Sequence, residues 1–235
     1  MPNDLADNLR AVRERMTQAA SRTGRDVSEI KLIAVSKTHP AEVLREAMDV
    51  GASVFGENKV QEAEGKIAEI GRDAAEWHLI GHLQSNKARK AVELFDVIHS
   101  VDSPELADRL ERICNETGRE KLSVLAQVDL AGEETKSGVS IDALLEMAGF
   151  LTTCKHLSFD GLMVLPPFYD DPEATRPYFK NLREIRDELA AQKAFGDGRG
   201  ELSMGMSHDF EVAIEEGATI VRVGTAIFGE RGIRG

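Results

Sequence analysis

The chain has 235 residues, 42% of them hydrophobic, and its 29 basic against 41 acidic residues give a formal net charge of −12. This length and apolar content suit one α/β domain with a sizeable core, so we expect residues 1–235 to form a single domain. The acidic balance argues against nucleic acid or an anionic membrane as a partner, because both require clustered lysine and arginine.

Neither the cysteines nor the N-terminus indicate export. The two cysteines form neither a disulfide framework nor a metal motif, which favours a reducing compartment. The N-terminus has no basic stretch followed by an apolar one, and no apolar run approaches the ~20 residues that a membrane helix needs. We therefore expect a cytoplasmic protein.

The first predicted elements are a helix and a buried strand. The apolar residues of the helix recur at intervals of four and three: Leu5, Leu9, Val12, Met16 and Ala19. Residues 32–35 are then aliphatic at every position, the pattern of a parallel strand buried on both faces. Pro40 suits the first turn of the next helix. Lys37 therefore lies at the carboxyl end of a buried strand, where α/β folds carry their chemistry. The alternative is a solvated loop lysine.

The remaining sequence alternates between helices and strands. We expect further strands at residues 52–55, 77–80, 95–101, 122–128, within 156–165, at 202–204 and at 219–223. Helices are expected between them, and glycine or proline punctuates most of their ends. In the helix that Ser140 caps, four residues are expected to face inward: Ile141, Leu144, Leu145 and Ala148.

Eight strands with seven intervening helices, preceded by one more helix, predict a single (β/α)₈ barrel of the TIM type. The first helix can cover the gap left after the eighth strand. An open doubly wound sheet is the alternative. No GxGxxG follows a strand and no GxxxxGK[ST] occurs, so the usual dinucleotide and P-loop nucleotide sites are not indicated.

Two loops suggest a phosphate site, because barrels commonly bind phosphate after strands seven and eight. The first runs over residues 203–209, and Ser207 occupies a position where its hydroxyl is expected to cap the next helix. The second contains Gly224 and Thr225, and Gly224 permits close approach of the backbone. The alternative is an ordinary capped helix and a tight turn.

Arg222 interrupts an otherwise apolar strand, so its charge should be paired or point at the barrel mouth. A guanidinium donates hydrogen bonds and does not accept them. Facing a pyridine nitrogen, it would keep that nitrogen unprotonated and make the ring a poor electron sink. The alternative is a structural ion pair with a neighbouring carboxylate.

A set of motifs between Lys31 and Arg231 resembles the pyridoxal phosphate homeostasis protein family: IAVSKTHP, FGENKVQEAEGK, WHLIGHLQSNK, TKSG, GLMVLPP, LSMGMSHDFEVAI and VRVGTAIFGER. The resemblance covers nearly the whole chain. It implies a barrel of pyridoxal phosphate fold type III, related to the barrel of alanine racemase.

The resemblance also implies roles for individual residues. Lys37 would form a Schiff base with the aldehyde of pyridoxal 5'-phosphate (PLP), and Arg222 would face the pyridine nitrogen. The remaining cofactor-binding residues that it implies are Ser207, Gly224 and Thr225 at the phosphate, and Asn58 and Asn86 at the mouth.

Two positions near the expected mouth depart from the family pattern. Lys59 stands where an aromatic residue often follows FGEN, and His82 where proline is frequent before LQSNK. Lys136 in TKSG resembles a family loop lysine, for which cofactor transfer and simple solvation are the two interpretations. The histidines form no pair with metal-ligand spacing, so no metal site is predicted.

Two functions are compatible with these residues. A racemase would need a second acid/base opposite Lys37, and racemases of this fold take a tyrosine from a second, β-rich domain. Neither Tyr169 nor Tyr178 lies in a motif that marks such a base. We therefore expect a non-catalytic PLP-binding protein of vitamin B6 homeostasis. PLP-dependent apo-enzymes are its candidate acceptors, and a monomer is expected because no long exposed apolar stripe is evident.

Overall fold

The structure, a computed structural model, describes residues 5–132 and 138–229. Eight parallel strands pair in chain order, and β1 also pairs with β8, so the sheet closes into a barrel. The strands are β1 (Lys31–Val35), β2 (Val54–Glu57), β3 (Glu76–Leu79), β4 (Val97–Val101), β5 (Leu122–Val128), β6 (Leu157–Val164), β7 (Glu201–Ser203) and β8 (Ile220–Val223). The predicted (β/α)₈ barrel is confirmed, and the open sheet is excluded.

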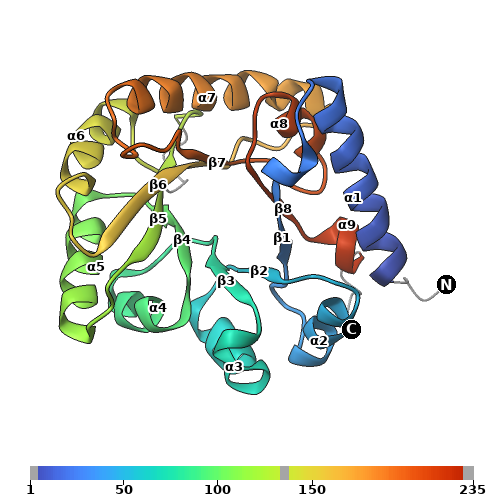
Figure 1. The fold of residues 1–235 in the computed structure, drawn as a ribbon, viewed down its shortest axis with the longest axis horizontal. Helices are drawn as coiled ribbons and strands as arrows, with labels where there is room; N and C mark the ends of the chain where they lie inside the picture. The colour runs from blue at the N-terminus through green and yellow to red at the C-terminus, as the bar shows by residue number, and fades with distance from the viewer. Residues whose placement is uncertain (1–4, 133–137, 230–235) are drawn as a thin grey trace.

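Helices surround the strands on the outside of the barrel (Figure 1). They are α1 (Leu5–Arg22), α2 (Ala41–Asp49), α3 (Val60–Ile70), α4 (Ala88–Leu94), α5 (Pro104–Thr117), α6 (Ile141–Leu151), α7 (Arg176–Ala191), α8 (Phe210–Glu215) and α9 (Thr225–Phe228), with short 3-10 turns η1 (Val27–Glu29), η2 (Arg72–Ala74), η3 (Ser85–Lys87) and η4 (Pro172–Thr175). The sequence did not predict α9. In the part of the chain that the structure describes, no helix is both long and apolar enough to cross a membrane.

The interior of the barrel follows from the period of two along each strand. One cluster of buried apolar residues comes from alternate positions of the strands and their ends: Ile33, Val35, Ile80, Val97, Leu125, Met163 and Ile220. The opposite faces of the strands belong to the larger core under the helices. The residues that continue the inward rows are therefore set to reach the two ends of the barrel.

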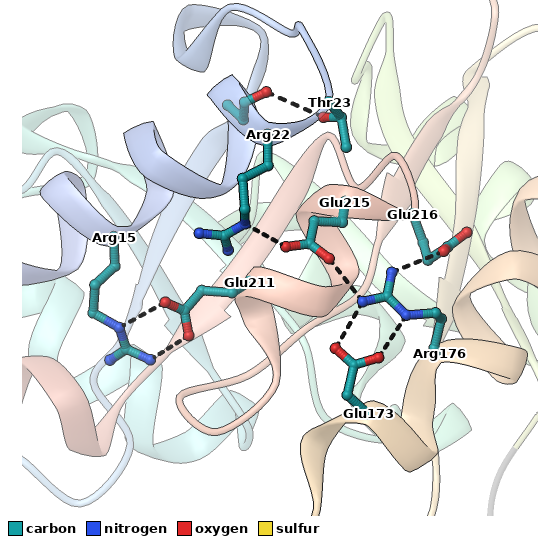
Figure 2. A network of polar contacts seen from close by, with 9 residues as sticks. Arg15, Arg22, Thr23, Glu173, Arg176, Glu211, Glu215 and Glu216 are labelled. Atoms are coloured by element: carbon teal, nitrogen blue, oxygen red, sulfur yellow. Dashed lines mark hydrogen bonds and ion pairs between the residues drawn. The ribbon is translucent and has the colours of Figure 1, made fainter.

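The first helix covers the outside of the barrel beside the last elements, as the sequence predicted. In Figure 1, α1 runs alongside α8 and α9, and it contacts both of them. Figure 2 shows the ion pairs that hold it there. Arg15 binds Glu211 at 2.8 Å, and Arg22 binds Glu215 at 2.6 Å. Arg176 of α7 binds the second oxygen of Glu215 at 2.7 Å, so one carboxylate joins the N-terminal helix to α7.

The prediction for α6 was wrong at two positions. Ile141 is 45% exposed and Leu145 53% exposed, whereas the buried stripe consists of Leu144, Met147, Ala148 and Leu151. The apolar residues of this helix span more than one stripe. The stripe that includes Met147 packs inward, and it leaves Ile141 and Leu145 on the solvent side. The cap by Ser140 is confirmed, since its side chain accepts a hydrogen bond from the Ala143 N–H.

Candidate functional site

Lys37 lies two residues beyond the end of β1, in a turn at the C-terminal end of the barrel. The inward row of β1, Ile33 and Val35, continues to this residue at a spacing of two. The side chain is half-buried, and its ammonium has no hydrogen bond or ion pair with any of residues 5–132 and 138–229. The next residue, Thr38, has φ of +69°, an uncommon conformation for a side chain branched at Cβ. Lys37 is thus an unpaired amine on a constrained turn.

A cluster of ionic side chains, Glu57, Glu62 and Lys66, holds the backbone of this turn. The Ser36 hydroxyl donates to Oε1 of Glu57 at 2.6 Å, and the Lys66 ammonium donates to the same oxygen at 2.7 Å. Lys66 also donates to the Ser36 carbonyl at 2.7 Å and to Glu62 at 2.8 Å. Glu62 in turn accepts the Thr38 N–H. The backbone on both sides of Lys37 is therefore held by one lysine and one carboxylate.

Glu57 is the least satisfied member of this cluster. Its side chain is fully buried, and Oε2 has no hydrogen-bond partner among the described residues. Burial raises the pKa of Glu57, and the charge of Lys66 opposes that shift. Removing the one lysine that pairs with a buried carboxylate destabilises the folded protein, because the charge is then left without compensation.

Arg222 lies beside β1 inside the barrel. It is the register partner of Ile33, it is 3% exposed, and its inward row includes Ile220. One terminal nitrogen donates to the Ser203 hydroxyl at 2.5 Å, and the other donates to the Val164 carbonyl at 2.9 Å. Desolvation lowers the pKa of Arg222 to about 10, so it remains charged at neutral pH.

These contacts bear on one of the two interpretations of Arg222, the structural ion pair. It forms no ion pair with a carboxylate in the described part of the chain, so the structural ion pair is not observed. Two of the five guanidinium N–H groups are bound by Ser203 and Val164. The remaining N–H groups have no hydrogen-bond partner among the described residues.

A row of buried polar side chains continues from Arg222 through the barrel, and the sequence analysis did not find it as a unit. The Ser203 hydroxyl lies 2.9 Å from Nδ1 of His99, and Nε2 of His99 lies 2.7 Å from Nδ1 of His78. Nε2 of His78 then lies 2.8 Å from Oε1 of Glu76, at the start of β3. Its buried members His78, His99 and Ser203 each occupy an inward position of a mainly apolar strand, and this is the same signal that Arg222 gives in β8.

Ser207 does not cap α8, so that prediction was wrong. Asp209 is the residue before α8, and its carboxylate accepts the Met206 N–H at 2.7 Å. The Ser207 hydroxyl oxygen instead accepts the N–H groups of Gly224 at 3.1 Å and Ala226 at 3.3 Å. The physical reason is that the chain makes one more turn before α8 begins, which carries Ser207 to the loop after β8. Ser207 and Gly224 are thereby brought together from two strands.

The loop after β8 also lies next to the end of β1. A Cβ built on Gly224 would lie 3.4 Å from Val35, an ordinary contact, so packing alone does not require glycine there. The ring of His39 stacks on Phe228 of α9, with centroids 4.7 Å apart. Thr225, the first residue of α9, is exposed. The structure thus places the proposed phosphate residues beside the turn of Lys37.

Asn58 and Asn86 follow the neighbouring strands β2 and β3 at the same end of the barrel. Asn58 is half-buried, and its backbone packs against Gly81, where an added Cβ would lie 2.3 Å from the Asn58 carbonyl oxygen. Asn86 is exposed in η3 and lines a surface groove with residues of α3 and α4. No described contact joins Asn86 to Lys37.

The residues that depart from the family pattern also lie at this end. Lys59 is exposed at the start of α3, and Nδ1 of the exposed His82 lies 3.1 Å from an Asp102 oxygen. Lys136 lies outside the described residues. Within those residues, no group of three or more His, Cys, Asp or Glu side chains is arranged to hold a metal ion.

Glu76 makes the free energy of unfolding depend on pH. Its hydrogen bond from His78, followed by that from Lys31, lowers the pKa of Glu76 to about 2 from an ordinary value near 4.5. A carboxyl with a lowered pKa in the folded state stabilises the protein above its unfolded pKa. This contribution is lost as the pH falls from about 4.5 to about 2.

We expect Glu76→Gln to destabilise the protein by about 1–2 kcal/mol at neutral pH, after allowance for the solvent exposure of Glu76. The difference from wild type should shrink as the pH falls toward 3. Urea unfolding at the two pH values measures both effects. Glu46→Gln, at an exposed position of α2, is the control. If the loss of unfolding free energy in Glu76→Gln relative to wild type were the same at both pH values, the lowered pKa of Glu76 would be contradicted.

Comparisons with known proteins agree over nearly the whole chain. A family model described as the N-terminal domain of alanine racemase matches residues 5–232. A pyridoxal phosphate homeostasis protein of Aquifex aeolicus is 45% identical over 225 residues, which are 96% of this chain and 97% of the relative. The Escherichia coli protein of the same name is 42% identical over 234 residues, with 97% of each chain covered.

Solved structures show the same relationship. The structure of PipY from Synechococcus elongatus with PLP bound is 44% identical, with a TM-score of 0.80 over 93% of this chain and 100% of that chain. Alanine racemase from Corynebacterium glutamicum shares the fold, with 22% identity and a TM-score of 0.73 over 99% of this chain and 63% of the racemase. The chain belongs to the pyridoxal phosphate homeostasis protein family, and its barrel is of the kind found in the N-terminal domain of alanine racemase.

Proposed function

We propose that this chain binds PLP at the mouth of its barrel through Lys37 and serves vitamin B6 homeostasis by holding the cofactor without turning it over. The observation that carries the proposal is the unpaired Lys37 amine, held on a fixed turn at the same end of the barrel as the Ser207 and Gly224 loops. The names of the relatives and the PLP in the PipY structure support the same ligand.

The described residues fit this cofactor. When bound, PLP supplies an aldehyde that condenses reversibly with an amine. Lys37 offers that amine free of a competing ion pair among the described residues. Arg222 offers hydrogen-bond donors only, which suits an unprotonated pyridine nitrogen. The Ser207 hydroxyl accepts two backbone N–H groups, so its own O–H is free to donate to a phosphate oxygen, with Thr225 and the Gly224 loop beside it.

The acid/base residues suit a carrier better than a racemase. A racemase needs an acid/base on each face of its substrate. The two tyrosine hydroxyls of this chain lie 2.9 Å apart and bond each other, with Tyr178 on the outer helix α7. The A. aeolicus and E. coli relatives, of which the chain covers 97%, both carry the name of homeostasis proteins. Apo-enzymes that use PLP are the proposed acceptors.

Reduction of the protein with borohydride in the presence of PLP is expected to leave a stable label on Lys37. Peptide mass spectrometry identifies the labelled residue, and Lys37→Ala should lose both the label and the visible absorption band. Lys59→Ala, another lysine at this end of the barrel, is the matched control and should keep both. A label on another lysine, or an unchanged spectrum in Lys37→Ala, would refute the site.

The same preparation tests for turnover. Incubation with L-alanine and other amino acids should form no more D-isomer than a heat-killed control. Measurable turnover would move the protein to the racemase class.

A further inference from the structure

Hydrogen bonds connect Arg222 to the opposite end of the barrel. The row runs through Ser203, His99 and His78 to Glu76, whose side chain is 36% exposed at the start of β3. Ser203 and both histidines are fully buried, and they come from β7, β4 and β3. Lys31, at the start of β1, binds Glu76 at 2.7 Å and completes the outer end.

The protons in this row can be assigned from its ends. Glu76 is ionised at neutral pH and can only accept, so Nε2 of His78 must donate to it. Burial lowers the pKa of His78 and, further, that of His99, so each ring carries one proton. The bare Nδ1 of His78 therefore accepts from Nε2–H of His99.

The same reasoning fixes the direction of the remaining two hydrogen bonds, up to Arg222. The bare Nδ1 of His99 accepts from the Ser203 hydroxyl, whose oxygen is left to accept from Arg222. All four hydrogen bonds point from the guanidinium toward the carboxylate. Each bond dipole is aligned with the field between these two charges, which strengthens the row cooperatively.

We propose that Glu76, His78, His99 and Ser203 form a one-way hydrogen-bond relay that positions Arg222 as a fixed donor toward the ring nitrogen of the cofactor. Only the last clause, on the ring nitrogen, rests on the proposed function. Ser203 and the two histidines are positioning residues, because they act through Arg222 and do not touch the cofactor.

The direction of the relay has a chemical consequence at the mouth. The Ser203 proton is committed to His99, so the hydroxyl cannot donate to a ligand, and its oxygen remains the acceptor for Arg222. Reversal would require the proton of each histidine to move to its other nitrogen, and the Glu76 carboxylate would then lose the hydrogen bond from His78 and keep only that from Lys31. Arg222 is therefore held in one orientation by a charge at the far end of the barrel.

The relay can be tested in the protein without cofactor. Nitrogen–proton NMR correlations of the imidazole rings report which nitrogen carries the proton. At neutral pH we expect His78 and His99 both to be protonated at Nε2 and bare at Nδ1. A proton on Nδ1 of either ring, alone or in addition, would overturn the relay. If the wild type failed to bind PLP, the proposed function would fall while this measurement still decided the relay.

A matched pair of variants tests the effect on the site. Ser203→Ala cuts the relay next to Arg222, whereas Ser100→Ala removes another buried hydroxyl, which donates to the Gly81 carbonyl at 2.7 Å. We expect Ser203→Ala to weaken PLP binding about tenfold and to shift the absorption maximum of the bound cofactor. Ser100→Ala should leave the maximum unchanged. Equal spectra and equal affinities in the two variants would overturn the positioning role.

Discussion

Lys66→Met is expected to lower the free energy of unfolding by about 3–5 kcal/mol, the cost of leaving one partner of a buried ion pair alone. Lys66 is the cation that Glu57 contacts in the core, and the second Glu57 oxygen has no partner among the described residues. Because burial raises the pKa of Glu57, the loss should be smaller in acid, where this carboxyl takes up a proton.

Two further variants make this prediction specific. Lys180→Met removes an exposed lysine whose ion pair with Glu184 spans 3.8 Å, and it should cost less than about 1 kcal/mol. The double variant Glu57→Leu/Lys66→Met removes both buried charges and should regain most of the lost stability. Urea unfolding curves give all three values. If Lys66→Met were no less stable than Lys180→Met, the buried pair would not hold the turn as described.

Gly81→Ala is expected to destabilise the protein by about 1–3 kcal/mol, because its Cβ would overlap the backbone of Asn58. The built Cβ lies 2.3 Å from the Asn58 carbonyl oxygen and 2.8 Å from its Cα, and neither atom can move without the loop. The displaced loop follows β2 and carries a residue proposed to line the mouth. We therefore expect weaker PLP binding as well.

Gly65→Ala is the matched control for Gly81→Ala. Gly65 lies inside α3, and nothing lies within 4 Å of a Cβ built there. Alanine is favoured over glycine in a helix interior, so this variant should gain about 0.5–1 kcal/mol. Thermal unfolding and a PLP titration of both variants separate the effect of crowding from that of substitution. Equal behaviour of the two variants would contradict the close packing at Gly81.

The architecture could be predicted because it depends on local patterns that repeat along the chain. The aliphatic run at residues 32–35 and its counterparts predicted the strands, and the count of alternating elements predicted closure. Lys37 and Arg222 stood out because each places a charge at the edge of, or within, an apolar strand. These signals need no knowledge of which residues meet in space.

The error in α6 concerned which face of one helix packs inward, whereas the failures at the site concern pairings between distant segments. Ser207 looked like the cap of the helix that follows it, but its partners are Gly224 and Ala226, which lie after the next strand. Likewise, the link between His99 and Ser203 spans 104 positions in sequence. Spacing along one strand shows that a side chain points inward, but register between strands decides which inward groups touch.

The ion pairs that hold α1 against α8 have a consequence for biosynthesis. Arg15 and its partner Glu211 are 196 positions apart. Helix α1 is therefore synthesised long before α8, the helix that it binds. Contacts of such long range form slowly, and until β8 pairs with β1 the edges of these two strands stay open to other strands. We expect nascent chains still on the ribosome to depend on chaperones until β8 has emerged from the exit tunnel.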